Sequence, residues 1–334
     1  MHRVQILNDL GLKTMTPIEI TIRPLRENDL PDADRIFRLA FGTFIGLPEP
    51  ITFGGDADYV RTRWLADPTS ALGAEAAGEL IGSNFLTSWG SVGFFGPLTI
   101  RPDYWDKGVA RRLLEPTIDI FAGWGTKLVG LFTFAQSTKH VHLYQQFGFW
   151  PQFLTAIMTK PVEQNPTALS WTGFSEMPAK ERTDCLKACS ELTGAIYEGL
   201  NVEREIRAVA DQKLGATILV WDDSRLSSNL TGFAVCHCGA GSEAGSGALY
   251  IKFGAARPGP AAERNFNRLL ESCEAFAASR GLEKLVAGVN TARIAAYRQM
   301  LAYGFRTFIQ GVAMQRSEDQ SYNRPDVYVI DDWR

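Results

Sequence analysis

The residues whose types and spacing most clearly suggest ligand binding lie between positions 96 and 114, where a strand-like segment runs through a short loop into a helix. The first amides of a helix have no partners within the helix and lie at its positive end, so they suit a pyrophosphate group. Gly108 and Ala110 open this helix, and residues this small allow a diphosphate to approach the backbone. Most strand-loop-helix passages bind nothing, so the pattern alone leaves a purely structural loop as the alternative.

Periodicity places this passage inside a mixed α+β unit. An alternating strand and two amphipathic helices come first, and three strand-like segments with turns at Gly78 and Gly90 then form an antiparallel meander. The pattern changes afterwards to helix, buried strand, short helix and strand. The first half is expected to contain strands at 18–23, 72–77, 80–88, 92–101, 128–134 and 153–160, with helices from Asp29 and at 57–65, 108–122 and 138–147.

A second pass through nearly the same order follows, apart from a first strand that the sequence does not place. Arg112-Leu113-Leu114-Glu115 recurs as Arg268-Leu269-Leu270-Glu271, and Gly148-Phe149 recurs as Gly304-Phe305, both 156 positions later. A shared offset across several elements indicates one fold used twice. The second half is expected to contain helices at 180–197, 202–212, 261–278 and 292–302, with strands at 217–221, 232–237, 248–253, 284–289 and 306–314.

The repeat fixes the predicted domain organisation. Residues 1–14 are interpreted as an N-terminal arm without an assigned function, and residues 15–162 as the first domain. The proline-containing stretch 163–179 is predicted to be a linker, followed by a second domain at 180–334. The fold class is therefore α+β, with two tandem domains, each a mixed and mostly antiparallel sheet flanked by helices.

The phosphate-binding passage resembles the signature of the GNAT (Gcn5-related N-acetyltransferase) superfamily, a strand, a Gln/Arg-x-x-Gly-x-Gly/Ala loop and a helix. Gly108 and Ala110 match its small residues, while Trp105 stands where the family usually has Gln or Arg. Residues 137–149 are similar to the family's second signature, Asn-x-x-Ala-x-x-x-Tyr-x-x-x-Gly-Phe. Together the two signatures cover most of residues 18–162 in the right order.

The resemblance implies an acyltransferase that uses acetyl-CoA as co-substrate. The family's tyrosine lies near the cofactor sulfur, so Tyr144 is the expected general acid, although a tyrosine here could also be only part of the core. Ser137 replaces the usual asparagine and can still form hydrogen bonds. His140 replaces the usual alanine one turn before Tyr144, where it could tune the tyrosine or contact the cofactor. The expected cofactor-binding residues are Leu98, Thr99, Ile100, Trp105, Asp106, Lys107, Gly108, Val109, Ala110, Arg111, Ser137 and His140.

The second copy keeps the frame and departs at the chemical positions. With the offset of 156, Gly108 corresponds to Arg264, Ala110 to Phe266 and Tyr144 to Met300. The two larger side chains would crowd a diphosphate, and methionine cannot donate a proton. The second cofactor site is therefore expected to be degenerate, with a rearranged site involving Tyr297 as the alternative.

The implied reaction is direct transfer of an acetyl group to an amine of a small molecule or peptide. A backbone amide near Leu98 to Ile100 would hold the oxyanion, and water is the expected base because the strands at 83–100 carry no Asp or Glu. Glu49 borders the acceptor side in the family and could hold a cationic acceptor; solvation alone is the other interpretation. The rival hypothesis from another class is a non-catalytic acyl-CoA-binding or interaction protein.

Composition gives no sign of other partners. The formal net charge of -3, without basic runs, gives no reason to expect a nucleic-acid or membrane partner. Without an apolar leader, the protein is expected in the cytoplasm, as a monomer or homodimer, and its five cysteines as free thiols. A zinc site at Cys185, Cys189, Cys236 and Cys238 is the less favoured alternative, so no metal is predicted.

Overall fold

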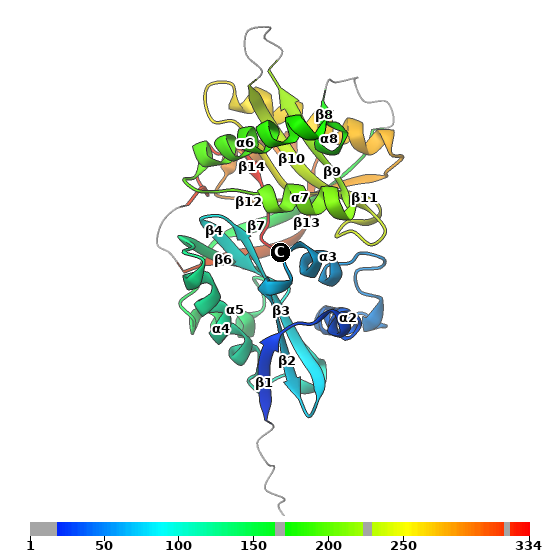
Figure 1. Ribbon diagram of the computed structural model, residues 1–334, viewed down its shortest axis with the longest axis vertical. Helices are drawn as coiled ribbons and strands as arrows, with labels where there is room; N and C mark the ends of the chain where they lie inside the picture. The colour runs from blue at the N-terminus through cyan, green and yellow to red at the C-terminus, as the bar shows by residue number, and fades with distance from the viewer. Residues whose placement is uncertain (1–18, 164–170, 223–228, 317–320) are drawn as a thin grey trace, which may run out of the picture.

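The computed structural model describes residues 19–163, 171–222, 229–316 and 321–334, and its first half follows the predicted order of elements (Figure 1). The one expected strand at 92–101 is divided in two after Phe95. The strands of this half are β1 (Ile20–Pro24), β2 (Ala71–Ala76), β3 (Glu79–Trp89), β4 (Val92–Phe95), β5 (Thr99–Ile100), β6 (Leu128–Thr133) and β7 (Trp150–Pro161). Its helices are α2 (Leu30–Phe44), α3 (Val60–Ala66), α4 (Val109–Gly123) and α5 (Thr138–Gln145).

The second half repeats these elements. Its strands are β8 (Thr172–Gly173), β9 (Gly215–Trp221), β10 (Leu230–Gly239), β11 (Gly245–Ala256), β12 (Lys284–Asn290), β13 (Arg306–Gln315) and β14 (Val329–Ile330). Its helices are α6 (Ala179–Ile196), α7 (Glu203–Gln212), α8 (Ala262–Ser279) and α9 (Ile294–Ala302). The strand that the sequence left unplaced is β8, which pairs with β9 and lies inside the stretch expected to be a linker.

The offset of 156 residues is visible in the structure. The pairs β6 and β12, α5 and α9, and β7 and β13 each begin 156 positions apart. Leu113 and Leu114 of α4 are fully buried, as are Leu269 and Leu270 of α8, because the same stripe of each helix packs on its sheet. The two copies therefore place equivalent residues in equivalent environments.

The two sheets expected from the sequence are one continuous sheet. Its central strand order is β6-β13-β7-β12, so the last strand of each half lies beside a strand of the other half. Strand β13 pairs with β6 over Val312 to Gln315, and β7 pairs with β12 over Thr155 to Pro161. A boundary at residue 162 therefore divides the chain but not the sheet, and neither half completes its sheet alone.

The helices cover both faces of this sheet. In the first half, α4 and α5 lie on one face and α2 and α3 on the other, and α6 and α7 lie over the sheet of the second half (Figure 1). The last residue of the chain lies at the centre of the molecule, between the halves (Figure 1). No helix in the described ranges combines the length and apolarity that crossing a membrane requires.

Candidate functional site

The predicted site is built around the interruption between β4 and β5. Gly96 has a φ of +146°, a conformation that favours glycine, and the chain turns away from β6 at this point. β4 pairs in parallel with β6, whereas β5 pairs with β3. Among the described residues no strand pairs with the other edge of β5, which we call the open edge and define as Leu98 to Ile100.

A run of unpaired backbone amides follows β5 in the chain, at residues 106–111. No carbonyl of the described residues accepts a hydrogen bond from the amides of residues 106–111, which lead into the first turn of α4. Gly108 precedes the helix with a φ of +77°, and open space surrounds the position where a side chain would start. Six consecutive donors at the positive end of a long helix form an arrangement that suits a diphosphate.

The side chains of this loop are mostly engaged elsewhere. The indole N–H of Trp105 donates to the carbonyl of Ile100 at 2.8 Å, and its backbone N–H donates to Pro102 at 3.2 Å. Trp105 therefore closes the loop onto the end of β5 and has only its ring left for a ligand. Asp106 forms an exposed ion pair with Lys139 of α5, which links the loop to the second predicted segment. The Lys107 ammonium lies 4.7 Å from the ring centroid of Tyr104.

Helix α5 brings Tyr144 to the same interruption. Its ring packs edge-to-face on Phe95, the last residue of β4, with 5.8 Å between the centroids. Burial raises the pKa of the hydroxyl, so Tyr144 stays protonated well above neutral pH. No described residue forms a hydrogen bond with this hydroxyl. A protonated donor without a partner among the described residues therefore lies beside the last residue of β4.

Ser137 and His140, the other predicted residues at α5, differ in their contacts. Ser137 precedes the helix, is nearly buried, and makes no side-chain hydrogen bond with the described residues. The His140 ring packs against Phe44 of α2, with 5.1 Å between the centroids, rather than against Tyr144. Burial lowers its pKa, and the positive charge of Lys139 lowers it further, so His140 is neutral at pH 7.

Glu49 lies in the exposed loop after α2. Its backbone carbonyl accepts hydrogen bonds from the amide and hydroxyl of Thr52, the last residue of a short turn of 3-10 helix at Pro50–Thr52. No described residue forms an ion pair with its carboxylate, so the structure shows no partner that would orient it. Its predicted contact with an acceptor stays a prediction.

In the second half, the counterpart of the open edge is occupied by the chain itself. Gly254, Ala255 and Ala256 of β11 lie 156 positions after Leu98, Thr99 and Ile100. Strand β14 pairs with Gly254 and Ala255, and the amide of Ala256 donates to the carbonyl of Tyr328. The backbone groups that are free in the first half therefore have partners in the second.

Arg293 holds this tail in place. It is fully buried at the start of α9, and its guanidinium donates to both carboxylate oxygens of Asp331, at 2.9 and 3.1 Å, and to the carbonyl of Val329. Arg293 stands 156 positions after Ser137, so the residue equivalent to a predicted cofactor contact binds the tail instead. The sequence analysis missed this contact, although the repeat offset applied to Ser137 points to Arg293.

The substituted positions of the second copy fit the same picture. Phe266 and Met300, which replace Ala110 and Tyr144, are fully buried in the core under α8 and α9. Arg264 is exposed on the first turn of α8. The second copy therefore has an exposed arginine and two buried apolar side chains at the three positions where the first copy has Gly108, Ala110 and Tyr144.

The cysteines lie apart from this site. Cys185, Cys189, Cys236 and Cys273 are buried and Cys238 is half-buried, all as free thiols. Within the ranges the structure describes, no group of three or more His, Cys, Asp or Glu side chains could hold a metal ion.

The comparison with protein families finds a match within the first half of the chain. Residues 35–149 match the Acetyltransferase (GNAT) family. No curated protein gave a match to the chain.

Solved structures match the whole chain at low sequence identity. A putative acetyltransferase from Pyrococcus horikoshii is 13% identical with a TM-score of 0.65, and the alignment covers 92% of this chain and 93% of that one. A GCN5-related N-acetyltransferase from Sphaerobacter thermophilus is 18% identical with a TM-score of 0.59, over 89% and 95% of the two chains. A tandem GNAT protein from the clavulanic acid biosynthesis pathway is 11% identical with a TM-score of 0.53, over 89% and 98%. At these identities the likeness shows the fold of two GNAT-like units in one chain.

Proposed function

We propose that this protein transfers an acetyl group from acetyl-CoA to an amine, because residues 35–149 match the Acetyltransferase (GNAT) family within a tandem GNAT-like fold. In this proposal, the groups that contact acetyl-CoA and the reacting atoms lie in the first half. The observation that supports this most strongly is the difference between the copies. Among the described residues, no strand pairs with the open edge of β5 opposite β3, whereas β14 pairs with the equivalent edge of β11 in the second copy.

The residues of the first half fit acetyl-CoA. The free amides of residues 106–111 would bind its pyrophosphate, and the absence of a side chain at Gly108 leaves room for it. Ser137 offers a hydroxyl that forms no hydrogen bond within the described ranges. When bound, acetyl-CoA supplies the activated thioester carbonyl and a thiolate leaving group.

The protein then supplies orientation and one proton. The acceptor amine loses a proton to water, and its nitrogen forms a bond to the thioester carbonyl carbon. A backbone amide of the open edge donates to the resulting oxyanion. As the bond between carbon and sulfur breaks, Tyr144 donates its phenolic proton to the sulfur and regains one from solvent. His140 is the weaker donor, because its lowered pKa leaves it neutral.

The test is release of free CoA, measured with a thiol reagent in the presence of acetyl-CoA and a panel of amines that includes peptides, polyamines and aminoglycosides. Turnover with at least one amine, and none without, is the expected result. Binding of acetyl-CoA without turnover on any amine would favour the rival, a non-catalytic acyl-CoA-binding protein.

A further inference from the structure

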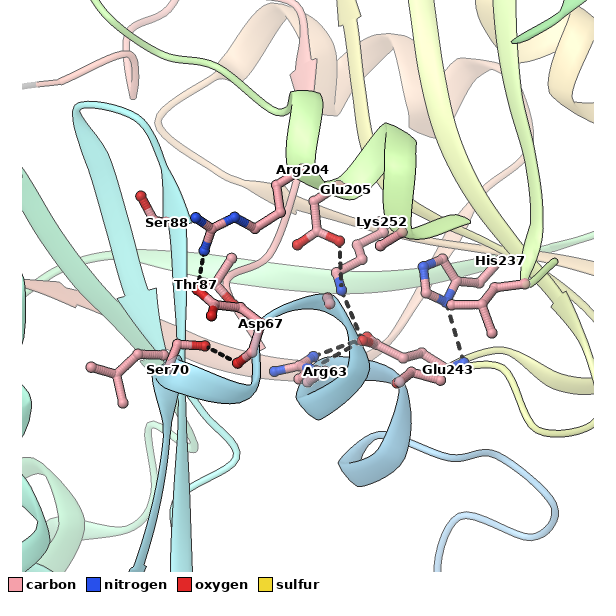
Figure 2. A pocket seen from close by; sticks show the side chains of 15 residues that line it. Arg63, Asp67, Ser70, Thr87, Ser88, Arg204, Glu205, His237, Glu243 and Lys252 are labelled. Atoms are coloured by element: carbon pink, nitrogen blue, oxygen red, sulfur yellow. Dashed lines mark hydrogen bonds and ion pairs between the residues drawn. The ribbon is translucent and has the colours of Figure 1, made fainter. Parts of the chain in front are cut away.

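Arg63 of α3 links Glu243 of the second half to Gly96, which lies at the interruption between β4 and β5. Its side chain is only 4% exposed, and the Glu243 carboxylate that it meets is not exposed at all. The guanidinium donates from Nε and Nη2 to the two oxygens of Glu243, at 3.0 and 2.9 Å (Figure 2). It also donates from Nη1 to the carbonyl of Gly96 at 2.5 Å and from Nη2 to the carbonyl of Arg334 at 2.6 Å.

Behind Glu243 a chain of buried charges returns to the first half. The Lys252 ammonium lies 2.8 Å from Glu243 and 3.1 Å from Glu205 of α7 (Figure 2). The indole N–H of Trp89 donates to Glu205 at 3.2 Å. Trp89 ends β3, the strand that pairs with β4. The network thus begins at Arg63 of α3, ends at Trp89 of β3, and has three middle members that come from the second half.

The network is buried, and its formal charges balance. Two cations face two carboxylates, and the adjoining cavity of about 20 Å³ has room for roughly one water molecule. Burial alone would raise the pKa of Glu243, but Arg63 and Lys252 more than offset this and hold the pKa well below its usual range. Buried ion pairs of this kind often give no more stability than apolar packing would, so their main effect can be to fix one arrangement of the parts they join.

The fixed part in this protein is the Gly96 carbonyl. The amide of Gly96 donates to Phe85 at 2.8 Å, and the following residue is a proline without an N–H. Arg63 therefore holds the carbonyl side of a turn that is otherwise held on its amide side. Leu98, the first residue of the open edge, follows only two positions later.

We propose that Arg63, held by Glu243 and Lys252 of the second half, is a positioning residue that fixes the open edge at Leu98–Ile100 for oxyanion binding. This inference rests on the proposed acetyl transfer. It gives the degenerate second copy a role in the reaction, because the charges that orient Arg63 belong to that copy. Arg63 itself touches neither substrate nor reacting atoms.

The test compares Arg63→Met with Lys160→Met. Lys160 of β7 forms a buried ion pair with Glu274 of α8, so its loss also removes a buried pair between the halves without touching Gly96. We expect Arg63→Met to lower kcat by about 10- to 100-fold, since small misplacements of catalytic groups have effects of this size. The Kd for acetyl-CoA should be unchanged, because the amides of residues 106–111 bind the pyrophosphate separately. Lys160→Met should keep its kcat while losing thermal stability.

Arg63→Lys keeps the test decisive if the methionine variant does not fold. A lysine ammonium can still pair with Glu243, but it lacks the planar fork that reaches Glu243 and two carbonyls at once. Its kcat should therefore fall although its stability is largely kept. Wild-type kcat in folded Arg63→Lys or Arg63→Met would overturn the proposal.

A second readout does not depend on activity. Hydrogen exchange of the amides of Leu98–Ile100 should become faster in Arg63→Met and stay unchanged in Lys160→Met. Equal exchange in the two variants would overturn the anchoring role. If the wild-type protein transfers acetyl to no amine, the proposed function fails, and the exchange comparison still decides whether Arg63 holds this edge.

Discussion

Replacing Tyr144 by phenylalanine separates binding from proton transfer in the first site. The change removes one hydroxyl and keeps the ring that packs on Phe95 at 5.8 Å. No described residue forms a hydrogen bond with that hydroxyl, so its removal leaves no buried donor or acceptor unpaired. We therefore expect folding stability to change by less than about 1 kcal/mol.

The catalytic effect should be much larger. General acid catalysis typically contributes on the order of 100-fold or more, which corresponds to about 2.7 kcal/mol of activation free energy. Burial raises the pKa of Tyr144, so the wild-type residue is fully protonated across the neutral range and the whole effect should appear at pH 7. The affinity for acetyl-CoA should be nearly unchanged, since the predicted pyrophosphate contacts lie on another element.

Single-turnover acetyl transfer is the appropriate assay, because slow product release could mask the loss in steady state. Tyr297→Phe is the matched control, since Tyr297 lies on α9, the counterpart of α5 in the second half. It should leave single-turnover transfer unchanged. Full activity in Tyr144→Phe would rule this tyrosine out as the acid, and a change confined to KM would also count against that role.

Three further predictions concern the cofactor loop, the tail and the buried histidine. Acetyl-CoA should raise the Tm of the wild-type protein and of Arg264→Glu but not of Gly108→Glu. Gly108→Ala is the control for backbone strain, because the φ of Gly108 is +77°. An undiminished Tm shift in Gly108→Glu would place the cofactor elsewhere. Arg293→Met should cost about 3–5 kcal/mol by leaving Asp331 buried without its partner, while calorimetry still gives one acetyl-CoA per chain; two would refute the closed second site. Burial lowers the pKa of His237 from 6.5 to about 4, so as the pH falls this histidine is protonated in the unfolded chain before it is protonated in the folded protein. Up to about 3 kcal/mol of folding stability should therefore be lost as the pH falls from 6.5 through 4. His237→Gln should remove this part of the pH dependence of Tm, and an unchanged profile would exclude His237 as its source.

Local sequence patterns predicted the elements because each helix and strand has its own apolar period. The repeat was predicted for the same reason, since Leu113 and Leu269 must occupy equivalent buried positions in α4 and α8. The repeated Gly148 and Gly304 both have positive φ angles, a conformation that favours glycine. These features depend on neighbours in the chain.

Features that depend on distant partners could not be predicted in this way. The alternation in β7 and β13 specifies two strands but not which strands lie beside them, so their exchange between the halves was missed. Strand β14 spans two residues and has no period to detect. The role of Arg63 was also invisible, because its partner Glu243 lies 180 positions away in the sequence.

The two copies differ in what meets the backbone groups at the equivalent strand edges. Where two neighbouring strands diverge, the backbone groups along the exposed strand edge lose their partners. An unpaired backbone group buried from water is costly, so such an edge needs either a ligand or another segment of the protein. In the second copy β14 meets this need, and Arg293 holds the tail where Ser137 stands in the first. In the first copy no described segment pairs with the open edge at Leu98–Ile100 or with the amides of residues 106–111, so the donors that remain free there are those that the proposed acetyl-CoA would satisfy.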